Sequence, residues 1–232
     1  MKSRINMSVG ESPFRERTVG EVAATLPGAT AVFRRHKLDF CCGGNTALRE
    51  SAERRGADLA AIESELAALA QSSVPRSAPE DTAALIKYIL THYHEVHRRE
   101  LPELVKLARK VESVHAEHPA APRGLADTLQ KMVGELEVHM KKEELILFPA
   151  MARAVKGMLD MPISQMRYDH DDHGTQLRRI EMLTRDFTLP EGACRSWQAL
   201  YSGTSKLVGD LMEHIHLENN VLFPRFESGR QT

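Results

Sequence analysis

Apolar residues recur every three or four positions along nearly the whole chain. This is the period of an α-helix that buries one face, whereas the two-residue alternation of a half-buried strand is rare here. The pattern therefore predicts an all-α protein.

The longest amphipathic stretches lie in the second two thirds of the chain. Proline-containing segments separate them, and the stretches predict four long helices, at residues 81–114, 122–155, 162–187 and 191–226. Long helices with one apolar face each are typical of a four-helix bundle. Pro102 lies inside the first of them and predicts a kink there.

The N-terminal third carries shorter helical patterns. They predict helices at residues 18–26, 29–36, 46–55 and 58–70. Thr18 and Glu21 have the spacing of a capping box at the start of the first one. The polar segment 71–80 contains two prolines and is typical of a linker. We expect a small helical domain with its linker at 1–78 and a bundle domain at 79–232.

Composition narrows the class of protein. The chain has 232 residues, 42% of them hydrophobic, and a formal net charge of -1, so it lacks the basic character that nucleic-acid binding would need. We find no apolar run long enough for a membrane span or a signal peptide. Three cysteines, two of them adjacent, do not make a disulfide framework. We expect a soluble cytoplasmic protein with neither nucleic acid nor a membrane as partner.

An eleven-residue motif occurs twice, at 139–149 and at 214–224. The two copies share His, Glu, Leu, Phe and Pro at the same offsets, so that His139 and Glu143 match His214 and Glu218. Residues four apart lie on one face of a helix, and each pair therefore points at one place. The Leu-Phe-Pro tails are expected to be structural, with their phenylalanines closing the core.

Each motif has a further histidine at nearly the same distance upstream. His94 precedes His139 by 45 residues, and His170 precedes His214 by 44. His97 and His173 remain alternatives, because a spacing of three keeps either member of the pair near one helix face. His92 and His216 are expected to point away from that face.

These residues predict a dinuclear metal site. A single His-x-x-x-Glu is usually a surface ion pair worth less than ~1 kcal/mol, but two copies in register with matched upstream histidines are not expected by chance. Four imidazoles and two carboxylates suit iron, and the repeat contains no thiolates of the kind that favour structural zinc. Manganese is the nearest alternative to iron.

In this order the residues resemble the hemerythrin-like family, over about 80–227. The N-terminal segment Leu38-Asp-Phe-Cys-Cys-Gly-Gly resembles the small domain that precedes a hemerythrin-like domain in the repair-of-iron-centers family. That resemblance implies a hemerythrin-like four-helix bundle and a cytoplasmic stress-response protein that repairs iron–sulfur clusters damaged by nitric oxide or peroxide.

The resemblance also implies a cofactor and its ligands. The cofactor would be two iron ions per chain in an oxo-bridged centre, with Glu143 and Glu218 bridging. The six implied ligands are His94, His139, Glu143, His170, His214 and Glu218. Oxygen carriers of the family use a fifth histidine in a His-His-x-x-x-Glu arrangement, whereas position 140 here is Met and position 213 is Glu. Fewer histidines leave the irons more open, which favours labile iron or nitric oxide chemistry over oxygen storage.

The implied partners are damaged iron–sulfur proteins, with nitric oxide or dioxygen as a small ligand, and a second copy of the chain is a candidate partner. Two alternative functions remain. One is an enzyme that reduces nitric oxide, and the other is a module that senses oxygen or nitric oxide.

Cys41 and Cys42 are a candidate redox pair. A disulfide between adjacent cysteines closes a strained ring that is easily reduced. Gly43 and Gly44 allow backbone amides to turn inward, and we expect such a nest to lower a thiol pKa. The alternative is that both cysteines pack as small apolar residues. Packing is also the expected role of Cys194.

Overall fold

The structure, a computed structural model, describes residues 13–72, 79–153 and 159–227. The chain divides into two compact units, residues 1–77 and 78–232. This division lies one residue from the domain boundary that the linker predicts. Most of the predicted linker, residues 73–78, lies outside the described residues.

The first unit consists of short helices: α1 (Val19–Thr25), α2 (Ala29–Arg35), α3 (Leu48–Arg55) and α4 (Leu59–Gln71). The predicted capping box is present at α1, where the Thr18 hydroxyl accepts from the Glu21 amide at 3.2 Å and the Glu21 carboxylate accepts from the Thr18 amide at 3.1 Å. Asp58 caps α4 by accepting from two backbone amides. These local signals explain why the short helices begin where the sequence predicts.

The core of this unit is built from apolar residues of all its helices and of the loop between α2 and α3. The largest fully buried members are Phe33, Phe40, Leu48, Ile62 and Leu66. Helix α4 packs against both α2 and α3. The loop that carries Cys41 and Cys42 is thus anchored at Phe40 in a packed core.

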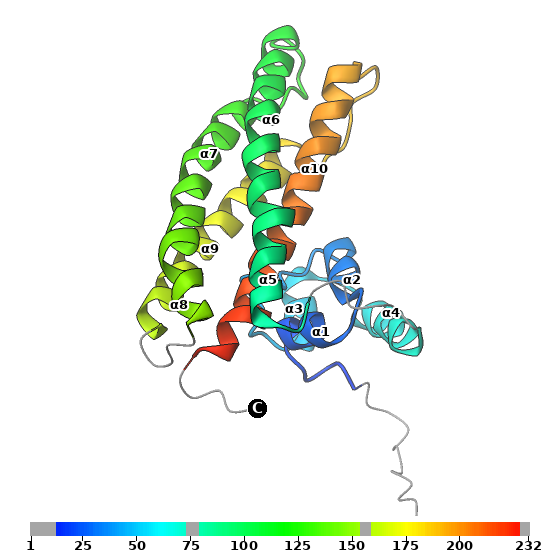
Figure 1. The fold of residues 1–232 in the computed structure, drawn as a ribbon. Helices are drawn as coiled ribbons and strands as arrows, with labels where there is room; N and C mark the ends of the chain where they lie inside the picture. The colour runs from blue at the N-terminus through cyan, green and yellow to red at the C-terminus, as the bar shows by residue number, and fades with distance from the viewer. Residues whose placement is uncertain (1–12, 73–78, 154–158, 228–232) are drawn as a thin grey trace, which may run out of the picture. The chain divides into compact units, whose positions relative to one another are not determined.

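The second unit is a four-helix bundle, built on α6 (Glu95–Val114), α7 (Leu125–Lys142), α9 (Asp160–Leu183) and α10 (Arg195–His216) (Figure 1). The four helices form a closed ring, in which α6 packs against α7, α7 against α9, α9 against α10, and α10 against α6. Two shorter helices, α5 (Thr82–Ile89) and α8 (Phe148–Ala152), continue two of these long helices. Each long helix together with the short segments that continue it is called a rod below. The described residues contain no β-strand, only an isolated bridge between Thr18 and Ala47. The all-α bundle prediction is confirmed.

Three of the rods are interrupted by π-helical segments that the sequence did not predict. They are η1 (Leu90–His94), η2 (Glu143–Leu147) and η3 (Leu217–Leu222), the last followed by the 3₁₀ turn η4 (Phe223–Arg225). In each, an amide bonds to the carbonyl five residues earlier, as the Phe148 amide does to Glu143. Helix α6 continues through Pro102 to Val114, and the π segment η1 lies upstream of that proline.

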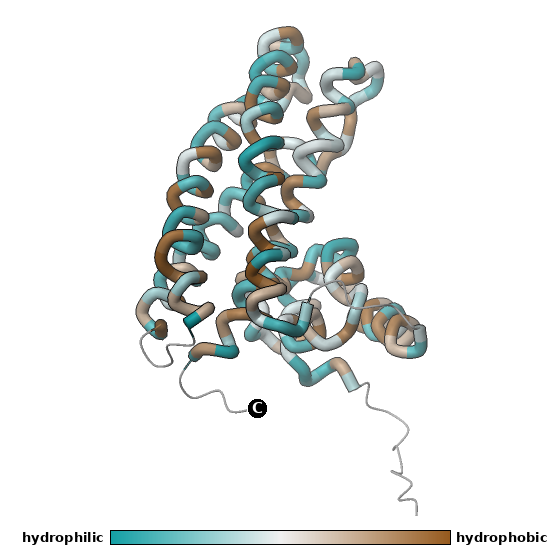
Figure 2. The backbone as a smooth tube through the Cα atoms, in the orientation of Figure 1, coloured by the Kyte–Doolittle hydropathy of each residue, from teal (hydrophilic) through white to brown (hydrophobic). Residues whose placement is uncertain are grey.

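Hydropathy follows the helical period in the long rods, where apolar and polar positions alternate along the tube (Figure 2). One end of the bundle holds an apolar cluster that includes both Leu-Phe-Pro tails, with Leu147 and Phe148 from one copy and Leu222 and Phe223 from the other. The expected structural role of the tails is confirmed. In the described part of the chain, none of the helices combines the length and the apolar character needed to cross a membrane.

Candidate metal centre

The six residues singled out by the repeat come together inside the bundle. Each of the four rods contributes: His94 ends η1, His139 lies on α7 with Glu143 at the start of η2, His170 lies on α9, and His214 lies on α10 with Glu218 in η3. All six residues are at most 2% exposed. They form two groups of four ligand atoms that share both carboxylates.

The first group pairs His94 with His214. Their Nε2 atoms are 3.1 Å apart. Glu218 Oε1 lies 3.1 Å from the Nε2 of His214, and Glu143 Oε2 lies 3.5 Å from the Nε2 of His94. Two imidazole nitrogens and one oxygen of each carboxylate therefore face a common point.

The second group pairs His139 with His170, whose Nε2 atoms are 3.0 Å apart. It uses the other oxygen of each carboxylate: Glu143 Oε1 lies 3.2 Å from His139 Nε2, and Glu218 Oε2 lies 3.1 Å from His170 Nε2. Each glutamate thus offers one oxygen to each group, which is the arrangement of a carboxylate that bridges two metal ions.

This donor set fits a pair of divalent cations. Burying two carboxylates is costly unless positive charge offsets them, and both oxygens of Glu143 lack a hydrogen-bond donor among the described residues. In each pair, two imidazole nitrogens face each other at 3.0–3.1 Å and can share at most one proton, so at least one lone pair is directed at the centre. Imidazole and carboxylate donors without thiolates suit iron.

The surrounding histidines keep the Glu218 carboxylate ionised. Complete burial alone would raise the pKa of Glu218, but the charge of His214 and the hydrogen bonds from His170 and His214 outweigh it and hold the pKa well below its usual range. Burial likewise lowers the pKa of His139, but the charge of Glu143 and the hydrogen bond to Asp169 outweigh it and raise the pKa to about 10. Histidine and carboxylate thus stabilise each other's charged forms, as a cation would stabilise the carboxylates.

Comparison with known proteins agrees with this geometry. The family described as Hemerythrin HHE cation binding domain matches residues 85–226. The chain belongs to this family. A second family, described as Domain of Unknown function (DUF542), matches residues 15–70. The Hemerythrin HHE match covers the four long helices of the bundle. It confirms the hemerythrin-like resemblance that the repeated motif indicated.

Relatives extend the likeness over both units. The chain is similar to proteins named iron-sulfur cluster repair protein YtfE from Yersinia pseudotuberculosis serotype IB (strain PB1/+) and Yersinia pestis (strain Pestoides F). In both comparisons the identity is 46% over 216 residues, which is 91% of this chain and 97% of the relative. The resemblance to the repair family, small N-terminal domain included, is therefore confirmed.

The outer nitrogens of three histidines in this hemerythrin-like centre have fixed partners. His94 Nδ1 donates to Glu144 Oε1 at 2.8 Å, and His170 Nδ1 donates to Asn219 Oδ1 at 2.8 Å. A hydrogen on Nδ1 leaves the lone pair on Nε2, the atom that faces the centre. These partners therefore select the tautomer that binds metal.

Charged residues hold these partners in place. Arg98 donates two hydrogen bonds to Glu144, at 2.7 and 3.1 Å, and one to Glu137 at 2.7 Å. His139 Nδ1 lies 3.4 Å from Asp169 Oδ2, and Lys142 donates to the same oxygen at 2.8 Å. The hydrogen bond with His139 is the main reason that the pKa of Asp169 lies well below its usual range.

Sequence reasoning missed Glu144 and Asn219, although the repeat carries their signal. Both occupy the sixth position of the eleven-residue motif, directly after the ligand-position glutamate. Each orients the upstream histidine of its own half. Asp169, which directly precedes His170 in the sequence, contacts His139 on α7 rather than its neighbour.

The histidines left as alternatives lie beside the two groups. His97 and His173 are buried but belong to neither, with ring centroids 5.4 Å from His214 and 5.0 Å from His139, respectively. Burial lowers the pKa of His97, and burial together with the charge of His139 lowers that of His173 to about 3. Both rings are therefore neutral side chains that pack against ligand-position histidines.

His92 and His216 lie outside the two groups, as helix geometry predicts. His92 is exposed and stacks on Tyr88. His216 is buried, however, and the Asn220 amide donates to its Nδ1 at 2.9 Å. The spacing predicted that His216 lies off the ligand face, but it did not indicate that the residue is buried.

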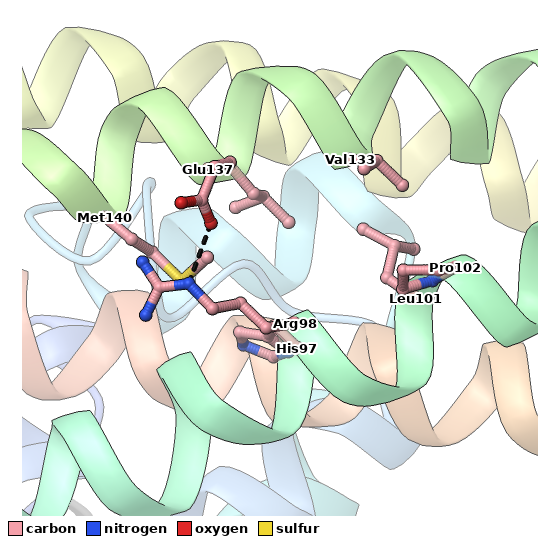
Figure 3. A pocket seen from close by; sticks show the side chains of 8 residues that line it. His97, Arg98, Leu101, Pro102, Val133, Glu137 and Met140 are labelled. Carbon is pink, nitrogen blue, oxygen red and sulfur yellow. Dashed lines mark hydrogen bonds and ion pairs between the residues drawn. The ribbon is translucent and has the colours of Figure 1, made fainter.

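A small cavity of about 100 Å³ lies between α6 and α7, next to His97 (Figure 3). Figure 3 shows Arg98 and Glu137 paired across it, with Met140 beside them. Because the His97 ring also packs near His214, the cavity lies close to the first group. Met140 occupies the motif position after His139 and contributes an apolar wall rather than a donor nitrogen or oxygen.

The cysteine pair lies in the first unit and differs from expectation in one respect. Cys41 and Cys42 are not joined in a disulfide, and their sulfur atoms are 3.6 Å apart. The expected lowering of a thiol pKa is wrong for Cys41: the hydrogen bond with Cys42 and nearly complete burial raise its pKa well above the usual value. Cys194 is half-buried, with its sulfur 3.2 Å from His115 Nε2.

Proposed function

We propose that this protein repairs iron–sulfur clusters damaged by nitrosative or oxidative stress, and that it does so with two iron ions held in the bundle. The observation that carries this is the sharing of Glu143 and Glu218 between two histidine pairs. The names of the similar Yersinia proteins support the repair role. The proposed site of action is the cytoplasm.

The ligand assignment follows from the two groups. One iron would be bound by His94 and His214 and the other by His139 and His170, with both glutamates and an oxo group bridging. When bound, the iron pair supplies redox chemistry and open positions for nitric oxide or dioxygen. The chain itself positions the imidazoles, through Glu144, Asp169 and Asn219. It also keeps both glutamates buried.

The proposed contribution to repair is a supply of iron to damaged iron–sulfur proteins. The protein offers each metal two nitrogens and two carboxylate oxygens, fewer donors than an octahedral ion accepts. Incomplete protein ligation favours exchange of the metal over permanent retention. An exchangeable iron is what a cluster that has lost iron requires.

The test is transfer of iron to a cluster-containing enzyme inactivated by nitric oxide. We expect the iron-loaded chain to restore activity, and we expect His214→Ala at equal protein concentration to lose most of that effect. His92→Ala is the matched control, because His92 is an exposed histidine outside both groups. Equal restoration by His214→Ala would contradict the proposal.

The second candidate is a nitric oxide reductase. It is favoured by the reduced thiols of Cys41 and Cys42, whose sulfur atoms are 3.6 Å apart. Oxidation of a dithiol to a disulfide releases two electrons and two protons, which matches the conversion of two nitric oxide molecules to nitrous oxide and water. Repeated rounds of nitrous oxide formation with a dithiol reductant, lost in Cys41→Ser/Cys42→Ser, would favour this function over iron supply.

A further inference from the structure

A second cluster of metal-ligand atoms lies outside the bundle, in the loop between α2 and α3. Asp39, Cys41 and Cys42 each offer one ligand atom, and the three atoms lie within 4.8 Å of one another. The two sulfur atoms are 3.6 Å apart, and Cys41 Sγ lies 3.4 Å from Asp39 Oδ1. Two thiols and a carboxylate therefore converge in one place.

These separations match the edges of a tetrahedral site. With metal–sulfur bonds of about 2.3 Å and metal–oxygen bonds of about 2.0 Å, two sulfur ligands lie roughly 3.8 Å apart and a sulfur and an oxygen roughly 3.5 Å apart. The observed distances of 3.6 and 3.4 Å are within a few tenths of an ångström of those values. The third separation, between Cys42 Sγ and the Asp39 carboxylate, is within 4.8 Å, so two of the three edges already have tetrahedral lengths.

The loop is also held in shape independently of any metal. The Cys42 amide donates to Asp39 Oδ1 at 2.9 Å, and the Gly44 carbonyl accepts from the Gly20 amide at 2.8 Å. A Cβ at Gly43 would lie 3.1 Å from the Asp39 carbonyl oxygen and 3.3 Å from its carboxylate carbon. Glycine at 43 therefore permits the close approach of the loop to Asp39.

We propose that Asp39, Cys41 and Cys42 bind one divalent cation of borderline softness, of the class of ferrous iron and zinc. Mixed thiolate and carboxylate donors suit such ions better than hard cations, which take oxygen ligands. Three protein ligands leave the fourth tetrahedral position open, as in zinc sites that exchange a ligand. Cys42 is only half-buried, so that position can be reached by a thiol or carboxylate of another molecule.

This site goes beyond the proposed repair function and is chemically distinct from the bundle centre. The bundle groups contain only histidine and glutamate, whereas the loop contains two sulfur donors. Binding displaces the thiol protons and requires the reduced pair. Oxidation to a disulfide removes both thiolates, so that a reversible loss of binding on oxidation is expected.

The test is titration of the reduced, iron-loaded full chain with Co²⁺, followed by thiolate-to-cobalt charge-transfer absorption. We expect one Co²⁺ per chain with this absorption in the wild type and in Cys194→Ser, the matched control for a thiol near a histidine. The absorption should be absent in Cys41→Ser/Cys42→Ser and in the milder Cys42→Ser. Asp39→Asn should weaken Co²⁺ binding by at least about tenfold, as loss of a charged ligand does.

Absence of the absorption in the wild type, or its persistence in Cys41→Ser/Cys42→Ser, would overturn the proposal. Helical content measured by circular dichroism shows that each variant is folded. Iron content is measured in the same samples to separate the two proposals. If the loop binds no Co²⁺ while the bundle retains its iron, the loop site is wrong and the repair function is unaffected.

Discussion

At the scale of single residues, the two buried glutamates connect the halves of the site. Glu143 and Glu218 are fully buried, and each contacts one histidine of both groups. A carboxylate in that position is costly without a cation nearby. The same geometry that favours two metals therefore makes the metal-free bundle less stable.

Loss of one ligand-position histidine should lower both metal content and stability. We expect His139→Ala or His214→Ala to reduce the bound iron sharply and to lower the midpoint of thermal unfolding by several degrees, since less metal then binds the folded state. Metal analysis and calorimetry on the same samples check this.

Two histidine variants serve as controls for that prediction. His92→Ala and His216→Ala should retain full metal content, because both side chains lie outside the groups. Because His216 is buried, His216→Ala leaves a cavity but removes no proposed ligand. It therefore separates the effect of a cavity from the loss of a ligand. Metal loss in His216→Ala with retention in His214→Ala would mean that the ligand face is wrong.

The sixth motif position gives a second prediction. Glu144→Ala and Asn219→Ala each remove the acceptor that fixes a histidine tautomer, and we expect metal affinity to fall about 10- to 100-fold. Competition with a chromophoric chelator measures this. Asn220→Ala is the matched control because Asn220 bonds to His216 instead; an equal loss there would argue for a general effect on the helix.

At the scale of elements, the sequence predicted helix ends well where a local signal exists. Thr18 and Asp58 cap α1 and α4 at the expected places, because capping depends on a few neighbouring residues. The π segments were not predictable, since one extra residue in a turn hardly changes the apolar period. Yet Glu143, Glu218 and His94 all lie within such segments.

The π segment η2 should be needed for the site. Ile146 lies in η2 and is 64% exposed, so its deletion removes no core contact but lets the segment return to α-helical spacing. That change would rotate Glu143 relative to Phe148 by about 100°, one residue's turn. We expect loss of bound iron, measured per chain, whereas Ile146→Ala should keep it. Full iron in the deletion variant would show that the wide turn is dispensable.

At the scale of the whole molecule, the repeat predicted the bundle and its ligand residues, but spacing left pairs of histidines unresolved. His94 and His97 lie near one helix face, and the tertiary rotation of the rod decides which ring faces the glutamates. The structure brings in His94 and packs His97 against His214. Partners such as a second copy of the chain remain predictions.

The two units should be separable in metal binding. Every residue of the two bundle groups lies after Pro79, and the second compact unit begins at residue 78. We expect a chain beginning at Pro79 to fold, bind two irons and show the absorption spectrum of the full protein, because the bundle buries its own apolar faces. Its cluster-repair activity should be impaired, as should that of Cys41→Ser/Cys42→Ser.

The comparison for that prediction is repair activity at equal iron loading among the full chain, the shortened chain and Cys41→Ser/Cys42→Ser. Equal activity in all three would assign the whole function to the bundle and reduce the cysteine pair to a packing role.

The central claim is that one bundle holds two iron ions between two shared carboxylates. The most direct measurement is the native mass of the iron-loaded Cys41→Ser/Cys42→Ser chain, in which the loop site cannot contribute. We expect two irons per chain, and a large loss of both in Glu143→Ala/Glu218→Ala on the same background, because each carboxylate serves both groups. A single iron in the parent, or two irons retained after removal of both glutamates, would contradict it.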